Sequence, residues 1–234
     1  MYSSPGYELY DQRTYVSRCP SCFGLHGYCI WRSRPMSGKH VAKNQPTTFI
    51  FSTENLKKKD EILKKYPTNR KKSAIMPLLY LAQKQNGGWI PLIAIKYIAE
   101  LLEVPYIKVY EVATFYTMYN LAPVGKYFVQ VCTTTPCAIR GSGKIVEMCK
   151  KFISTKEGHL SNDEKSSWIE VECLGACVNA PMIQINDDYY EDLDAETAEK
   201  IFKSFADDKL PKIGSQKGRK GSEPINQRLT LLNK

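Results

Sequence analysis

The sequence lacks the features that mark several common classes of protein. None of its apolar runs approaches the ~20 residues that a membrane-spanning helix needs, and its N-terminal region contains no hydrophobic signal core. No G-x-G-x-x-G motif occurs, so we expect that the chain by itself binds no dinucleotide. What the 234 residues do contain is 43% hydrophobic side chains, enough for a packed core. We therefore expect a soluble protein, which could still sit on a membrane-bound partner.

Positive charge is abundant but unevenly placed. The formal net charge is +9, and basic residues concentrate in Lys57–Lys72 and in Lys209–Lys234. A nucleic-acid-binding module would interleave aromatic with basic residues, and neither run does so. We interpret the first run as a solvated helix face and the second as a flexible tail, and we expect no nucleic-acid partner.

The first half of the chain changes character at about residue 48. Residues 1–47 are rich in Tyr, Ser, Arg and Gly without sustained periodicity, which indicates an irregular extension. From there to residue 122 apolar residues recur with a helical period and predict a small bundle. The expected helices begin near Ser52, Ser73, Pro91 and Pro105, and the last carries Val109, Val112, Ala113 and Tyr116 on its apolar face.

A second domain is expected over residues 123–208, because an extended pattern begins after Pro123-Val124-Gly125. The predicted order is strand, helix, strand, then strand, strand, helix. That order is typical of a thioredoxin-like domain, in which a parallel crossover is followed by a hairpin. The predicted class is thus α+β or α/β, with a basic tail at 209–234. Expected strands cover 126–132, 167–173 and 181–186 with a last one at 189–190, and expected helices cover 141–152 and 195–206.

Four of the eight cysteines follow this pattern closely. Cys132 ends the first predicted strand and Cys173 ends the second, while Cys137 and Cys177 come soon after, spaced C-x4-C and C-x3-C. Parallel strands would bring all four thiols to one edge of the sheet. Thiolates suit either a tetrahedral zinc ion or an iron–sulfur cluster. The cysteine spacing distinguishes zinc from an iron–sulfur cluster only in part. The loops are wider than a C-x2-C zinc knuckle, and Gly175 permits backbone N–H groups to approach sulfur, which suits a cluster.

The remaining cysteines give weaker signals. Cys149 falls on the apolar face of its helix and is interpreted as core. Cys19, Cys22 and Cys29, with His26 among them, could form a second metal site, but no predicted strand or helix frames them. We expect an extension without a metal there.

The segments VCTTTPC and ECLGACVNAPMIQINDDYYEDL resemble the cluster loops of the thioredoxin-like [2Fe–2S] subunit family of respiratory complex I, the NADH–quinone oxidoreductase. KSAIMPLLYLAQKQNGGWIP and YEVATFYTMYNLAPVGKY resemble its helical N-terminal region, and the likeness runs roughly from Phe49 to Leu232. The resemblance implies a [2Fe–2S] cluster on Cys132, Cys137, Cys173 and Cys177. It also implies a larger partner subunit that binds FMN and NADH, and electron transfer toward a quinone in the assembled enzyme.

Two rival functions stay open at this point. The same cluster subunit could serve an NAD-linked hydrogenase or a formate dehydrogenase, or the four cysteines could hold zinc in an adaptor protein. We favour the cytoplasmic side of a bacterial inner membrane, with the mitochondrial matrix as the alternative, because Glu8 and Asp11 suit a transit peptide poorly.

Overall fold

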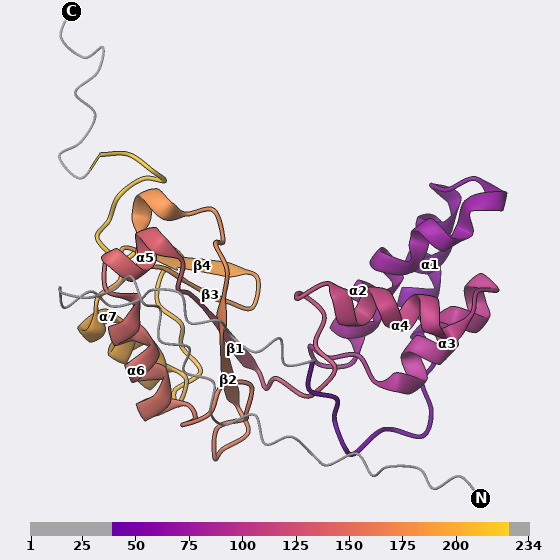
Figure 1. The fold of residues 1–234 in the computed structure, drawn as a ribbon, viewed down its shortest axis with the longest axis horizontal. Coiled ribbons are helices and arrows are strands. Elements are labelled where there is room, and N and C mark those ends of the chain that lie inside the picture. Colours follow the sequence, from indigo (N-terminus) through magenta and orange to yellow (C-terminus); the bar gives the residue numbers. More distant parts are fainter. Residues whose placement is uncertain (1–38, 225–234) are drawn as a thin grey trace, which may run out of the picture. The chain divides into compact units, whose positions relative to one another are not determined.

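The computed structural model describes residues 39–224, and its first part is helical (Figure 1). Ser52 caps the first helix by accepting the Asn55 N–H, as its sequence predicts. The second helix begins two residues later than expected, after a short 3-10 segment. The elements are α1 (Thr53–Lys64), η1 (Thr68–Ala74), α2 (Ile75–Gln85), α3 (Leu92–Leu102) and α4 (Tyr106–Phe115).

The apolar faces of these helices form one core. Its fully buried members include Leu78, Ile95 and Ile98, and Val109 and Ala113 of α4 join them as predicted. The expected role of Tyr116 is wrong. The helix ends at Phe115, and Tyr116 is extended and 38% exposed.

Residues 39–47 are irregular in backbone but are attached to the helices. The Lys39 amine donates to the carbonyl oxygens of Ala113 at 2.8 Å and Tyr119 at 2.7 Å, and so satisfies acceptors at the end of α4 and just after it. Gln45 Oε1 accepts the Leu92 N–H at 2.9 Å at the start of α3. The end of the expected extension therefore belongs to the helical part in its contacts.

The second part is a mixed sheet with the strand order β2-β1-β3-β4-β5. β1 and β2 are parallel, with Cys132 opposite Val171, and β3 is antiparallel to both β1 and β4. The predicted parallel crossover and hairpin are confirmed. The strands are β1 (Tyr127–Cys132), β2 (Ser166–Val171), β3 (Ile183–Ile185), β4 (Asp188–Glu191) and β5 (Gly214–Ser215).

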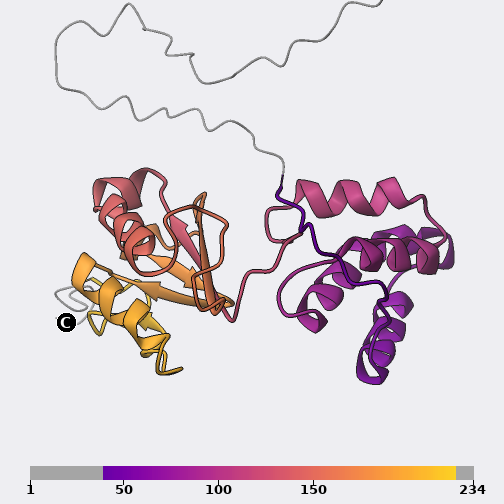
Figure 2. The ribbon, with the colours of Figure 1, turned by 90° about the horizontal axis from the view of Figure 1, so that it is seen from below.

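Helices α6 (Ser142–Phe152) and α7 (Ala195–Ser204) pack beside each other and share one core with the sheet (Figures 1 and 2). Ile145 and Cys149 face this core from α6, and Ala198 and Ile201 face it from α7, all at most 1% exposed. Asp194 caps α7 by accepting the Thr197 N–H, as predicted.

Several details of the sheet part differ from the expectation. The strand expected over 181–186 is shorter and covers Ile183–Ile185. β2 ends at Val171, not at Cys173, because β1 ends opposite it. Cys137 lies in a short helix, α5 (Thr135–Ile139), which Pro136 favours at its first turn. The tail was expected to be flexible, yet β5 pairs with β4 inside it. Its Gly-Ser sequence has no strand propensity that would have indicated this.

No helix in the described range 39–224 is long and apolar enough to cross a membrane.

Candidate metal centre

Cys132 and Cys137 form the buried half of the candidate site. Cys132 ends β1, and its N–H donates to the Met182 carbonyl at 3.4 Å, while α5 places Cys137. Each is 1% exposed, and both pack against Ala180 and Met182. Core packing therefore fixes the position of these two thiols.

Cys173 and Cys177 form the outer half. Their Sγ atoms lie 3.3 Å apart; Cys173 is exposed and Cys177 is partly exposed. Cys173 follows β2 by two residues, and Cys177 begins the 3-10 turn η2 (Cys177–Asn179). The loop that carries this pair packs against the cluster around Cys132 and Cys137 through Leu174 and Ala176, but the two thiols themselves lie outside that core.

Thr134 lies between the two pairs. Its hydroxyl is 3.2 Å from Cys132 Sγ, and a hydrogen bond from the same side chain helps to lower the pKa of Cys173. The thiols also affect one another, since charge on Cys132 contributes to raising the pKa of both Cys137 and Cys177. The predicted convergence of the four cysteines at one edge of the sheet thus takes the form of two interacting pairs.

The environment gives each of three thiols a different acidity. Burial raises the pKa of Cys137 to about 12. The Gly175 N–H, which donates to Cys173 Sγ at 3.4 Å, lowers the pKa of Cys173, whereas a hydrogen bond with Cys173 raises that of Cys177. These pKa shifts arise from neighbouring thiols, Thr134, backbone groups and burial, and no lysine, arginine or carboxylate of the described residues contributes to them.

Gly175 allows the outer loop to take its path. Its φ of +86° lies in the left-handed region, which a side chain would strain. The Tyr189 hydroxyl donates to the Leu174 carbonyl at 2.8 Å and ties this loop to β4. The expected N–H contact to sulfur is therefore present at Cys173.

Soft thiol donors in two pairs fit a two-iron cluster, whose irons each take two cysteines. Within residues 39–224, no three Cys, His, Asp or Glu side chains are grouped so that they could hold a single metal ion. Two exposed apolar side chains flank the site, Ile139 at 78% and Val178 at 67% exposure.

Other predicted positions separate clearly from this site. Cys149 is buried in the core between α6 and the sheet, as expected. Cys19, Cys22 and Cys29 lie outside the described residues. Sequence reasoning missed Arg219, Asp192 and Asn179. These three residues form a buried polar network that includes the last residue of η2. No spacing or motif in the sequence pointed to them.

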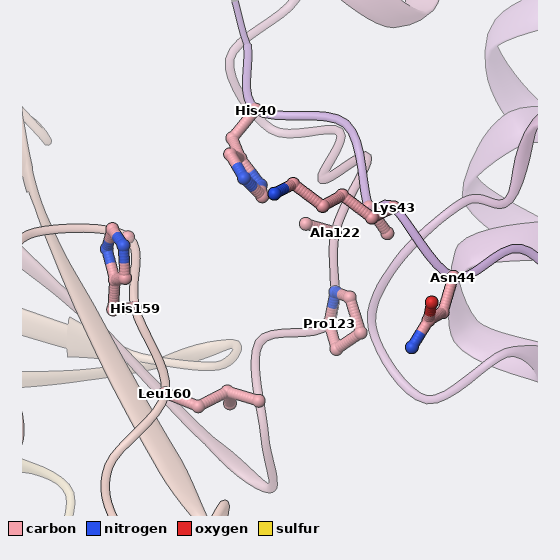
Figure 3. Close-up of a pocket in the computed structure, with 9 residues that line it drawn as sticks. His40, Lys43, Asn44, Ala122, Pro123, His159 and Leu160 are labelled. Carbon is pink, nitrogen blue, oxygen red and sulfur yellow. The ribbon is translucent and has the colours of Figure 1, made fainter.

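A pocket of about 340 Å³ lies elsewhere on the chain and contains none of the cysteines (Figure 3). His40 and Lys43 line it from the segment before α1, and His159 and Leu160 line it from the loop before β2. The rings of His40 and His159 are 6.4 Å apart. The lining offers no thiol or carboxylate, so the chemistry indicated by the cysteines does not extend to this pocket.

Comparison with known proteins gives consistent results. The family model described as thioredoxin-like [2Fe–2S] ferredoxin matches residues 59–206. An NADH-quinone oxidoreductase subunit of Rickettsia bellii (strain RML369-C) is 57% identical over 162 residues, 69% of this chain and 97% of that protein. Mitochondrial NADH dehydrogenase (ubiquinone) flavoprotein 2 of Dictyostelium discoideum is 49% identical over 206 residues, 87% of this chain and 83% of that protein.

Among solved structures, an air-oxidized NAD+-reducing [NiFe]-hydrogenase is similar to this chain with a TM-score of 0.48 and 18% sequence identity. The match covers 56% of this chain and 23% of the hydrogenase chain.

Proposed function

The chain belongs to the thioredoxin-like [2Fe–2S] ferredoxin family, and from this premise we propose that it is the electron-transfer subunit of NADH–quinone oxidoreductase, respiratory complex I, that carries this domain. The observation that carries the proposal is the pairing of four thiols at the end of β1 and in the loop after β2, inside the matched residues. The chain is thus one subunit of an oxidoreductase and not an enzyme by itself.

We propose Cys132, Cys137, Cys173 and Cys177 as the ligands. A bound [2Fe–2S] cluster supplies a site that accepts and returns one electron. The chain's own residues would determine where that site lies and how exposed it is. The buried pair, Cys132 and Cys137, would keep one side of the cluster away from water. The Gly175 N–H at Cys173 Sγ favours negative charge on that sulfur.

The proposed partner is the larger subunit that binds FMN and NADH, with other complex I subunits around it. The apolar side chains of Ile139 and Val178, beside the cysteine loops, suit coverage by a protein surface. We also propose the division into an extension (1–47), a helical part (48–122), a cluster domain (123–208) and a tail (209–234). Part of the tail is bound to the sheet, because β5 pairs with β4.

The proposed location is the cytoplasmic face of a bacterial inner membrane, or its mitochondrial counterpart on the matrix side. Both compartments are reducing and keep thiols available as ligands. The bacterial and mitochondrial relatives support the two locations equally.

Substitution of single cysteines tests the ligand set. Changing any of Cys132, Cys137, Cys173 or Cys177 to Ala should abolish assembly of the two-iron cluster, because one thiolate of a four-ligand site is lost. Cys149→Ala is the matched control: it should keep the iron and lose about 1–2 kcal/mol of stability from the core.

Iron and acid-labile sulfide are measured on each purified variant, together with the visible spectrum. Two irons retained in Cys177→Ala would contradict the assignment. A colourless wild-type chain with one zinc would instead support the adaptor alternative.

A further inference from the structure

The chain beyond α7 returns to the sheet through a tightly bonded turn. Ser215 of β5 pairs with Glu191 of β4. The Ser215 hydroxyl accepts the N–H groups of Lys217 at 3.2 Å and Arg219 at 3.3 Å, and it donates to Asp192 Oδ2 at 2.6 Å. This turn holds the backbone of Arg219 beside Asp192.

The Arg219 side chain is buried in an ion pair. Its Nε donates to Asp192 Oδ2 at 2.9 Å, and the two side chains are 8% and 3% exposed. Nη1 donates to the Glu223 carbonyl at 3.0 Å. A buried pair of this kind adds little net stability, because its desolvation offsets the attraction. The contribution of this ion pair to stability therefore does not explain why it is placed here.

The remaining Arg219 donor reaches the turn that begins with Cys177. Nη2 donates to the Val178 carbonyl at 3.1 Å and also to Asn179 Oδ1. Asn179 is 3% exposed, and its Nδ2 donates to Glu191 Oε2 at 2.5 Å and to the Gly221 carbonyl at 2.8 Å. The guanidinium thus joins Asp192, which follows β4, to the returning tail and to both residues after Cys177.

The outer thiols need such support more than the inner ones. Cys132 and Cys137 are held by packing at 1% exposure, whereas Cys177 is partly exposed and Val178 after it is 67% exposed. A three-residue 3-10 turn has little stability of its own. The position of the Cys177 sulfur therefore depends on what fixes the backbone of residues 178 and 179.

We propose that Arg219 is a positioning residue of the metal centre: by binding Val178 and Asn179 it fixes the turn that presents the Cys177 thiolate. The proposal rests on the proposed function, since it takes Cys177 as a cluster ligand. A planar guanidinium suits the role because it donates in several fixed directions at once, to a carboxylate on one edge and to the turn on the other.

The test compares full-length chains loaded with iron and sulfide. Arg219→Gln removes the positive charge and the planar set of guanidinium N–H donors. Lys220→Gln, which replaces a neighbouring exposed cation, is the matched control. We expect iron release to a chelator to be about tenfold faster or more in Arg219→Gln, since loss of outer support typically costs that much in metal affinity. We also expect a changed low-temperature paramagnetic resonance line shape after dithionite reduction. Lys220→Gln should match wild type in both.

A purely structural role would lower the melting temperature while the resonance signal and iron release stay unchanged, and that result would overturn the proposal. If Arg219→Gln does not fold, Arg219→Lys is the deciding variant, because it keeps a cation beside Asp192 but lacks the guanidinium donors. Wild-type behaviour of Arg219→Lys in both assays would refute the positioning role of Arg219. A wild-type chain without two irons would instead contradict the proposed function, and the same release assay on the metal that it holds would still test Arg219.

Discussion

At the scale of single residues, exposure divides the described cysteines into two groups. Cys132, Cys137 and Cys149 are at most 1% exposed, whereas Cys173 is exposed and Cys177 partly so. Alkylation of a buried thiol has to wait for local opening of the fold, and an exposed thiol reacts from the native state.

In the cluster-free chain we therefore expect iodoacetamide to modify Cys173 and Cys177 about tenfold faster or more than the three buried thiols. Peptide mass spectrometry after timed quenching measures each rate, and Cys149 serves as the internal reference. Equal rates at Cys177 and Cys149 would contradict the division into an outer and an inner pair.

The strand pattern was sufficient to predict which loops carry the two pairs of thiols, because Cys132 ends a strand whose parallel neighbour precedes Cys173. It could not predict which pair is buried. That depends on Met182 and Ala180, which the segment before β3 brings over Cys132 and Cys137. Arg219 was beyond sequence reasoning for a similar reason, since its partners Asp192 and Val178 lie 27 and 41 positions away in the chain.

At the scale of elements, one glycine controls how β1 approaches β2. Gly125 has a φ of +77°, and a Cβ there would lie 2.7 Å from the Lys165 carbonyl oxygen. Lys165 immediately precedes β2, so the contact is with backbone and cannot be relieved by rotating a side chain.

We expect Gly125→Ala to lower the free energy of unfolding by about 2–4 kcal/mol, from left-handed strain plus overpacking. Gly143→Ala in α6 is the matched control, because nothing lies within 4 Å of its added methyl group. It should leave stability unchanged or raise it by about 0.5–1 kcal/mol. Urea unfolding followed by circular dichroism gives both values; equal stabilities would show that β1 can shift to accept the methyl group.

Elements with strong patterns were predictable and short ones were not. The helices that begin at Thr53 and Ala195 carry a capping side chain and a clear apolar face, and both were expected. α5 has five residues and β5 has two, too few to show a period. β5 forms because β4 offers it an edge, which is a property of the folded sheet.

At the scale of the whole molecule, the start of the chain can be tested by two deletions. Removing residues 1–37 should leave iron content and melting temperature unchanged. Removing residues 1–47 should also keep the iron but lower the melting temperature, because Lys39 binds the end of α4 and Gln45 the start of α3.

Metal analysis and thermal unfolding of both truncated chains decide the matter. Stoichiometric loss of iron or zinc from the chain that lacks residues 1–37 would show that Cys19, Cys22 and Cys29 do hold a metal.

The proposed division of labour with a flavin-binding partner gives a second prediction at this scale. The isolated chain should not oxidise NADH, because it carries no dinucleotide fingerprint. Rapid mixing with NADH followed by low-temperature paramagnetic resonance should give a reduced [2Fe–2S] signal only when the flavin-binding partner is present. NADH turnover by the chain alone would refute the carrier role, and a cluster that stays oxidised beside a competent partner would place it off the electron path.

The return of the tail to η2 also has a consequence for protein synthesis. All four proposed ligands leave the ribosome before Arg219, which follows Cys177 by about forty residues and so by about two to eight seconds at ordinary rates of translation. During that interval the nascent chain has every thiol but not the guanidinium behind Cys177. A product that terminates early or is clipped before Arg219 would keep the complete cysteine motif and yet give up its iron easily. If Arg219 has the proposed positioning role, retention of the metal thus depends on the tail as well as on the four cysteines.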